Sequence, residues 1–424
     1  MSRATSRAGS RAAPEPLGAR PAGARAVDVA IVGAGPVGLL LACLLAARGV
    51  DVVVLERRAE PGGRTRAIGI HPPGLAALDA AGIGASVRRE ATAIRSGIAS
   101  CQGRRLGALD FGDDPVLSLP QHRTESLLEA RLAALAPRAM HRGVEMTGLR
   151  ESGSRVMVRV AGDETGWRAR YVVGADGVRS TVRKMLGAAW IARPGFARYA
   201  MADAPERADP SASALLHLEP DGVVESFPLP GGVRRWVARL DEGAVTDGRR
   251  FAALVESRTG TAIEALAEPS EFIARQHLAS SFARGRTALV GDAAHEVSPI
   301  GGQGMNLGWL DAVHLDRAIA LALETGAPRE PFAHYDRARR SAARRAMRQA
   351  AFNMAMGAPA HGMRLTTRNA LVGLLSRRPA RDILARAFTM DGLSTGSMPR
   401  SAGQSTRTSA PRRGLGGEDR CTPD

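Results

Sequence analysis

Short apolar runs separated by a glycine-rich break predict a strand, turn, helix and second strand over residues 27–56. Val27, Val29 and Ile31 lie in the first apolar run, and the residues that follow the break, 39–47, are good helix formers. The second apolar run, at residues 52–55, ends in Glu56. This order is typical of a βαβ unit.

The break between the first strand and the helix has the spacing GxGxxG, with glycines at positions 33, 35 and 38. In such a unit Gly33 permits a tight turn, Gly35 lets a pyrophosphate approach the backbone, and Gly38 lets the helix pack closely on its strand. The helix start faces the phosphates with free N–H groups, and Glu56 is placed to accept hydrogen bonds from a ribose diol. The unit predicts a dinucleotide site, but it does not distinguish FAD from NAD.

Two later stretches also place a glycine-flanked aspartate after a predicted buried strand. A strand at residues 170–173 precedes Asp176, and a strand at residues 287–290 precedes Asp292. Glycines at positions 301, 302 and 304 then open a helix predicted over residues 305–323. The carboxyl ends of strands are where open α/β sheets bind ligands, and a glycine-rich helix start offers backbone amides to a polar group. Both stretches are therefore candidate ligand-binding corners.

The rest of the pattern predicts a mostly β lobe over residues 190–273, with helices before and after it. Short apolar runs at residues 214–218, 223–227 and 235–240 are separated by Pro-Asp-Gly and Pro-Gly-Gly turns. Helices are predicted over residues 75–81, 126–135, 251–256, 261–267, 331–356 and 364–388.

These elements predict an α/β protein in which a mostly β-sheet substrate domain is inserted into a Rossmann-like nucleotide-binding domain, followed by C-terminal helices. The expected segments are a disordered N-terminal lead (1–25), the nucleotide-binding domain (26–95, 121–189 and 274–330), the substrate domain (96–120 and 190–273), the C-terminal helices (331–391) and a disordered tail (392–424).

Composition narrows the class of function. The 424 residues carry a formal net charge of +16 with a single lysine, Lys184, so the positive charge reflects a general use of arginine. Aromatic residues make up 4% and offer no stacking platform for bases, so nucleic acid is not expected as a partner. The three cysteines are far apart and predict neither a disulfide framework nor a metal site. A soluble, cytoplasmic protein is expected, because no apolar run is long enough to span a bilayer.

Three motifs in this order resemble the FAD-dependent aromatic hydroxylases of the para-hydroxybenzoate hydroxylase type. They are the glycine turn at residues 33–38, GADGVRSTVR at residues 174–183 and GDAAHEVSPIGGQGMN at residues 291–306. The resemblance implies FAD as the cofactor, NADH or NADPH as the co-substrate, and O2. It further implies that a small aromatic substrate is hydroxylated through a flavin C4a-hydroperoxide.

The resemblance also implies roles for single residues. Glu56 would hold the adenosine ribose, Asp292 the ribityl chain, and Asp176 would lie near the pyrophosphate and affect the use of NAD(P)H. The backbone of Gly304, Met305 and Asn306 would meet the N1–O2 edge of the flavin, and the carbonyl of Pro299 would lie near the oxygen-transfer position. The other expected cofactor contacts are Gly33, Gly35, Pro36, Val37, Gly38, Arg57, Arg66, Gln121 and Arg123.

Several points stay open at this stage. His71, His217 and His295 are the candidate bases by position, and none is assigned. Trp190, Phe227 and Trp236 are candidates for the wall of a substrate pocket. The serine and arginine that clamp a benzoate in the type enzyme have no counterpart in the β lobe, so a polyketide- or quinone-like phenol is expected rather than a carboxylated substrate.

Two alternatives compete with the hydroxylase. One is a reductase of the geranylgeranyl-reductase kind, which acts on a double bond without O2. Another is a flavoprotein-like binding protein without catalysis. Residues 364–388 mix leucines with arginines, as an interfacial helix on a membrane does. A helix that covers the core is favoured there over peripheral membrane contact.

Overall fold

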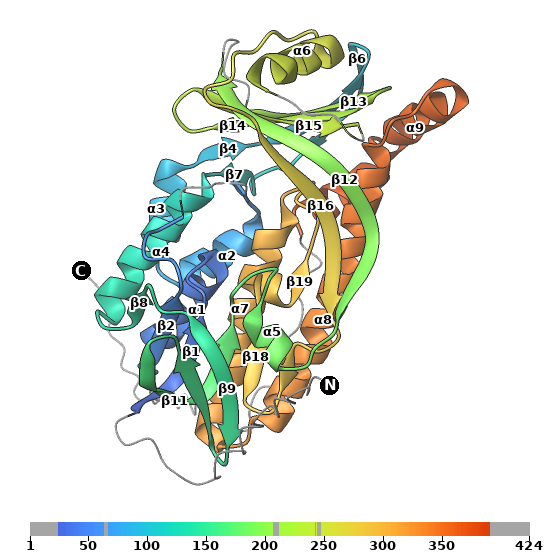
Figure 1. Cartoon of the computed structure of the whole chain (residues 1–424). Helices are drawn as coiled ribbons and strands as arrows, with labels where there is room; N and C mark the ends of the chain where they lie inside the picture. Colours follow the sequence, from blue (N-terminus) through green and yellow to red (C-terminus); the bar gives the residue numbers. More distant parts are fainter. Residues whose placement is uncertain (1–23, 63–66, 207–211, 242, 244–246, 391–424) are drawn as a thin grey trace, which may run out of the picture. The chain divides into compact units, whose positions relative to one another are not determined.

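The computed structural model describes residues 24–62, 67–206, 212–241, 243 and 247–390, all within one compact unit (Figure 1). Its helices are α1 (Pro36–Ala47), α2 (Pro72–Ala80), α3 (Gly84–Glu90), α4 (Gln121–Leu135), α5 (Thr181–Met185), α6 (Gly248–Thr259), η1 (Gly291–Ala293), α7 (Gln303–Thr325), α8 (Arg329–Met356), α9 (Gly362–Leu375) and α10 (Ala380–Phe388). Its strands are β1 (Arg25–Val32), β2 (Val52–Glu56), β3 (Gly69–Ile70), β4 (Thr92–Ile94), β5 (Ser96–Cys101), β6 (Arg104–Asp110), β7 (Val116–Ser118), β8 (Met140–Arg142), β9 (Met146–Ser152), β10 (Arg155–Val160), β11 (Asp163–Gly174), β12 (Trp190–Pro205), β13 (Ser213–Glu219), β14 (Gly222–Leu229), β15 (Val233–Leu240), β16 (Ser270–Ala279), β17 (Ala283–Arg284), β18 (Thr287–Leu289) and β19 (His295–Glu296).

The first sheet contains the predicted βαβ unit. Its strand order is β17-β18-β11-β1-β2-β8, with β10 and β9 continuing antiparallel from β11. β18, β11, β1, β2 and β8 run parallel to one another, and α1 contacts β1, β2, α4 and α7. Because β1, β11 and β18 are parallel neighbours, their carboxyl ends meet at one edge. The three glycine-and-acid stretches of the sequence therefore start from the same edge of one sheet.

The second sheet forms the predicted β lobe. Its order is β19-β16-β12-β15-β14-β13-β5-β6, and β12 pairs antiparallel with both β15 and β16 (Figure 1). Adjacent residues of a strand point to opposite faces, so Val237 joins an apolar cluster with Tyr199 and Met201, whereas Trp236 joins another with Phe251 of α6. The strands predicted at residues 214–218, 223–227 and 235–240 are confirmed as parts of β13, β14 and β15.

Two predicted helices differ from the structure. Residues 261–267 are not helical, and the prediction there was wrong. Gly260 ends α6 with a φ of 72°, Pro269 follows closely, and the amide of Leu266 donates to the carbonyl of Asp203 on β12 at 2.8 Å. The stretch is too short to nucleate a helix alone and hydrogen-bonds to the sheet instead. Residues 364–388 form two helices, α9 and α10, because Pro379 interrupts the helical pattern.

The ends of the chain fall largely outside the described residues. Residues 1–23 of the predicted lead and the predicted tail at residues 392–424 lie outside them, whereas Arg25, at the end of the predicted lead, opens β1. The predicted domain boundary at residue 273 falls within β16, which runs on to Ala279. In the part of the chain that is described, none of the helices combines the length and the apolar character needed to cross a bilayer.

Candidate active site

The glycine turn after β1 is crowded beside two of its glycines and open beside the third. Gly33 has a φ of 108°, and a Cβ there would lie 2.4 Å from the carbonyl oxygen of Ala175. A Cβ on Gly38 would lie 2.2 Å from the carbonyl oxygen of Gly33. Beyond its chain neighbours, Gly35 has no atom within 4 Å of the place where its Cβ would be. Gly33 and Gly38 therefore serve the packing of the turn, and Gly35 leaves its backbone accessible to a ligand.

The stretch after β11 packs directly on this turn. Asp176 accepts the backbone N–H groups of Thr181 (2.7 Å) and Val182 (3.1 Å) with Oδ2, which holds the start of α5. Its Oδ1 is buried without a hydrogen-bond partner. A buried oxygen atom without a hydrogen-bond partner is costly, and a polar ligand at this corner would relieve that cost.

The start of α7 is braced by Asn306. Its fully buried side chain accepts the backbone N–H of His71 at 2.9 Å and donates to the carbonyls of Gly69 and Gly302, both at 2.9 Å. Gly302 precedes the helix with a φ of 66°. The first-turn amides that follow have no earlier turn to bond to, so they carry the positive end of the helix dipole.

A buried ionic network holds the motif that contains Asp292. Asp311 of α7 accepts from His295 (2.5 Å) and Arg339 (2.6 Å), and it also accepts the backbone N–H of Gly291 at 3.2 Å. Burial raises the pKa of Asp311, but the charges and hydrogen bonds of His295 and Arg339 outweigh burial and lower it. His295 is therefore part of the support of this loop rather than a group that faces a substrate.

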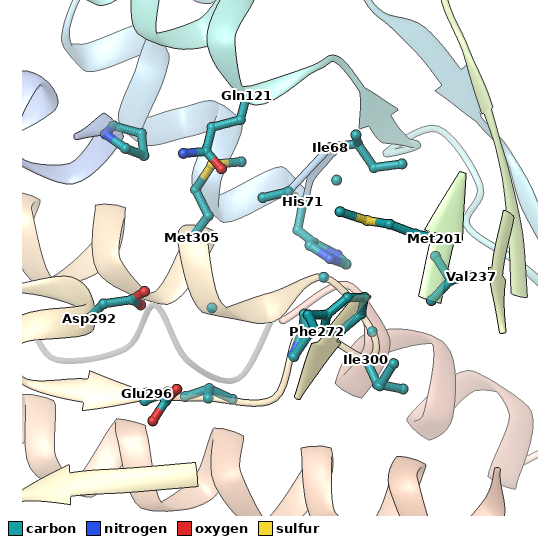
Figure 2. Close-up of a pocket in the computed structure, with 18 of the residues that line it drawn as sticks. Ile68, His71, Gln121, Met201, Val237, Phe272, Asp292, Glu296, Ile300 and Met305 are labelled. Atoms are coloured by element: carbon teal, nitrogen blue, oxygen red, sulfur yellow. The ribbon is translucent and has the colours of Figure 1, made fainter. Parts of the chain in front are cut away.

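The three corners line one cavity of about 490 Å³. Gly35, Gly177, Asp292 and Gly304 all belong to its wall. In Figure 2, Asp292 and Met305 lie toward one end of the cavity, and Met201, Val237 and Ile300 lie toward the other. The second end is lined mostly by apolar side chains from the second sheet, from a small third sheet of order β3-β7-β4, and from the surrounding loops and α10. They are Ile68, Ile94, Val116, Met201, Phe227, Val237, Phe272, Ile300 and Phe388.

Glu56 lies at the other end of the glycine turn, where it is buried and fully engaged. Its Oε2 accepts the backbone N–H of Ala34 at 2.9 Å, and its Oε1 accepts Nε and the backbone N–H of Arg58, each at 2.9 Å. Burial raises the pKa of Glu56, but the hydrogen bonds and charge of Arg58 outweigh burial and lower it. Ala34 and Arg58 also line a second cavity of about 280 Å³. A ribose diol that reached Glu56 from this cavity would donate to the same carboxylate as Arg58.

The remaining expected cofactor residues divide into three groups. Pro36, Val37, Gln121, Pro299 and Met305 line the large cavity. Arg57 is exposed, and Arg123 pairs with Glu90 at 3.0 Å and lines neither cavity. Arg66 lies outside the described residues. The carbonyl of Pro299 accepts the N–H of Gly302 at 2.9 Å, so one of its lone pairs is used within the turn.

Of the three candidate histidines, only His71 lines the cavity. Burial lowers its pKa to about 4, so it is neutral at physiological pH. His217 contacts Ser100 at 3.2 Å and stacks near Trp236, away from the cavity. Phe227 lines the cavity, whereas Trp236 packs on the opposite face of its sheet and Trp190 stacks on Arg183 at 3.7 Å.

Sequence reasoning missed several cavity residues, among them Met201, Glu225, Arg235, Phe272 and Phe388. Phe388 comes from α10 and stacks on Phe111 at 5.2 Å. The one signal in the sequence was Glu225, a carboxylate inside an apolar strand pattern. Which face of the strand is buried depends on strand pairing, and the sequence does not state the pairing.

The open space at Gly35 suggests a direct test of cofactor fit. A Gly35→Ala change should leave the apoprotein as stable as wild type, because the new methyl group meets no protein atom. It should weaken FAD binding by ~10- to 100-fold, since overpacking a well-fitted contact costs about 1–3 kcal/mol. Gly33→Ala is the matched control, because its methyl group collides with Ala175 and should destabilise the apoprotein itself. Flavin fluorescence titration and thermal melting measure the two effects, and equal FAD affinity in Gly35→Ala and wild type would contradict the expectation.

Known proteins share this fold and sequence. Residues 26–350 match the family described as "FAD binding domain". The 12-dehydrotetracycline 5-monooxygenase/anhydrotetracycline 6-monooxygenase of Streptomyces rimosus is 34% identical over 334 residues, 74% of this chain and 66% of the relative. The rifampicin monooxygenase of Streptomyces venezuelae is 33% identical over 317 residues, 71% of this chain and 65% of the relative. The chain thus spans slightly less than two thirds of the length of these relatives.

Two solved structures extend the comparison. The OxyS anhydrotetracycline hydroxylase from Streptomyces rimosus superposes with a TM-score of 0.71 at 31% identity, over 86% of this chain and 76% of that one. The p-nitrophenol 4-monooxygenase PnpA from Pseudomonas putida DLL-E4 has a TM-score of 0.78 at 24% identity, over 87% and 99%, and supports the fold alone. The expected resemblance is confirmed: the chain belongs to the FAD binding domain family and has the FAD-binding fold of the flavin-dependent hydroxylases.

Proposed function

We propose that the protein is an FAD-dependent monooxygenase that uses NAD(P)H and O2 to hydroxylate an aromatic substrate. The observation that carries the proposal is the continuity of one cavity from Gly35 and Asp292 to Met201 and Phe227. A cofactor held at the glycine corners would present its reactive ring to the apolar end of the same space. Relatives named as monooxygenases of anhydrotetracycline and rifampicin favour oxygen transfer over the reductase alternative.

FAD, when bound, supplies the transfer of electrons from NAD(P)H to O2. In this proposal the accessible backbone at Gly35 and Gly177 would meet the pyrophosphate, and Asp292 would accept hydrogen bonds from the hydroxyl groups of the ribityl chain. The first-turn amides of α7 would face the edge of the flavin ring on which negative charge develops, and they would stabilise that charge without reorganising. Asn306 keeps these amides in place through its contacts with the loop before α2.

The apolar end of the cavity suits a flat, largely hydrophobic ring system. Its side chains exclude water and orient the ring, which supports chemistry that water would otherwise intercept. According to their names, the two Streptomyces relatives act on 12-dehydrotetracycline and anhydrotetracycline and on rifampicin. We therefore propose a fused phenol of the polyketide or quinone type as the substrate.

The test is an assay of purified holoenzyme with NADH or NADPH and a panel of fused phenols and quinones. The expected result is substrate-stimulated consumption of NAD(P)H and O2 together, with a product that mass spectrometry shows to carry one added oxygen. Argon should abolish this product. A reduced product that forms equally under argon would instead support the double-bond reductase. If the FAD-bound protein did not oxidise NAD(P)H in the presence of any member of the panel, this result would contradict the hydroxylase.

Two further proposals concern the setting of the enzyme. We place it in the cytoplasm, supported by Cys43 and Cys101, which are buried and unpaired. We also favour α9 and α10 as a cover of the cavity rather than a membrane contact. Both helices contact β6, and Phe388 of α10 lines the cavity, although Leu374 and Ile383 are 62% and 68% exposed.

A further inference from the structure

Glu225 stands in the middle of an otherwise apolar row across the second sheet. It lies on β14, directly opposite Val237 of β15 and Leu216 of β13, and Val237 in turn lies opposite Met201 of β12. Glu225 is 5% exposed and belongs to the wall of the large cavity, together with Met201 and Val237. Its carboxyl group is therefore presented to the apolar end of the cavity.

Within the part of the chain that the structure describes, the carboxylate of Glu225 is not paired with a counter-charge. Across the described residues, no hydrogen bond or ion pair reaches it, and burial alone raises its pKa to about 7. The other buried acids differ: Glu219 accepts the backbone N–H of Gln102, and Asp316 accepts from Arg48 at 2.7 Å. An unpaired buried carboxylate destabilises a fold, so its presence at the cavity wall points to a ligand that it serves.

The charged and titratable groups around this part of the cavity are already engaged or lie in neighbouring rows. Arg235, two residues along β15 from Val237, pairs with Asp203 at 2.7 Å. Tyr199 and Arg239 face each other in the next row, and burial raises the pKa of Tyr199. The other cavity residues of this kind are His71, Arg275, Asp292 and Glu296. His71 is neutral above a pH of about 4, so it does not titrate together with Glu225 near neutrality.

We propose that Glu225 is a catalytic residue: its carboxylate accepts a hydrogen bond from the ring hydroxyl of the bound phenol and takes the proton of that hydroxyl. The O–H bond of the phenol breaks, its electron pair stays on the phenol oxygen, and a new O–H bond forms on the Glu225 carboxyl. The ring becomes a phenolate, which is richer in electrons at the adjacent carbon. This inference rests on the proposed hydroxylase function and names the proton acceptor of the same site.

The test compares wild-type holoenzyme with Glu225→Gln on probes of different acidity. On 1-naphthol, a weak acid, wild-type kcat/KM should rise with pH through a value near 7, because Glu225 must be ionised. Glu225→Gln should lower kcat/KM on 1-naphthol by ~100-fold or more and abolish its rise with pH, as the loss of a general base does. On 4-nitrophenol, which ionises by itself above neutrality, the loss should be small. Binding of 4-nitrophenolate at pH 8.5, followed by its absorbance, should tighten by about ten-fold in Glu225→Gln because a like charge is removed.

Two controls separate this role from a structural one. Glu225→Gln should melt at or above the wild-type temperature at pH 8.5, since glutamine removes a buried negative charge. Glu271→Gln makes the same chemical change on β16, where Glu271 is exposed and pairs with Arg198 at 2.9 Å, and it should leave every readout unchanged.

Different results would overturn different claims. If Glu225→Gln turned over 1-naphthol normally and its kcat/KM rose with pH as in wild type, the proposed role of Glu225 would be wrong. The proposed hydroxylase function would not be affected. Wild-type holoenzyme that consumes no NAD(P)H and O2 with any phenol would overturn the hydroxylase, and the role of Glu225 would fall with it.

Discussion

Replacing Asp311 with asparagine is expected to lower the free energy of unfolding by about 3–5 kcal/mol, the usual cost of removing one partner from a buried ion pair. Asp311 is fully buried and accepts from both His295 and Arg339. Asparagine retains the shape but not the charge, so the guanidinium of Arg339, only 2% exposed, would lose its counter-ion. Urea denaturation of the holoenzyme, followed by far-UV circular dichroism, measures the change.

The matched control is Asp79→Asn, which breaks an ion pair with Arg88 whose partners are 41% and 48% exposed. Exposed pairs contribute little, and a loss below about 1 kcal/mol is expected there. The pKa of Asp311 is lowered in the folded protein, so its stabilisation is present above the usual aspartate range and is lost as pH falls through the folded value. The difference in the free energy of unfolding between wild type and Asp311→Asn should therefore become smaller at acidic pH. Equal losses for the two variants at pH 7 would show that the buried network is not the stabilising feature.

Asn306→Leu is expected to destabilise the protein by about 3 kcal/mol or more and to weaken FAD binding as well. The side chain of Asn306 satisfies the N–H of His71 and the carbonyls of Gly69 and Gly302, and each buried polar group left unpaired costs about 1–3 kcal/mol. Leucine can replace none of these bonds. The start of α7 would also lose its connection to the loop before α2, and the amides that face the cavity would no longer be held in place.

Urea denaturation of the apoprotein separates the loss of stability from the loss of FAD affinity, which flavin fluorescence reports. Asn353→Leu is the control, because Asn353 is half-buried on α8 and accepts one hydrogen bond from Gln349 at 3.0 Å. Its expected cost is below about 1 kcal/mol. If Asn306→Leu bound FAD with wild-type affinity, the bracing role of Asn306 would be ruled out.

Predictions from sequence were strongest where a structure depends on neighbours along the chain. The strand and helix around the glycine turn follow from apolar runs, and the conformation at Gly33 follows from the need for a residue without a Cβ. The same holds for α7 and α8, whose long amphipathic patterns were predicted to within two residues. The prediction failed at residues 261–267, where a hydrogen bond from Leu266 to β12 outweighs a moderate helical preference.

The roles of the side chains in the site were harder to predict from the sequence than the helices and strands. Glu56 has the spacing of a ribose acceptor, but only the structure reveals that Arg58 and Ala34 share its carboxylate. Arg123 follows Gln121 closely in sequence, yet a helix turns the two side chains apart, and only Gln121 reaches the cavity. His295 belongs to a recognisable motif, and its contact with Asp311 assigns it to the support of that motif.

The sequence by itself determined the chemistry of the nucleotide corners, because glycine turns and strand-end acids are local features that a few adjacent residues specify. Only the tertiary structure decided that Gly35, Asp292 and Gly304 line one cavity and that Glu225 lies at its apolar end. The physical reason is that these residues are brought together by the order and register of the strands. That order depends on burial summed over the whole chain and cannot be read from any one stretch.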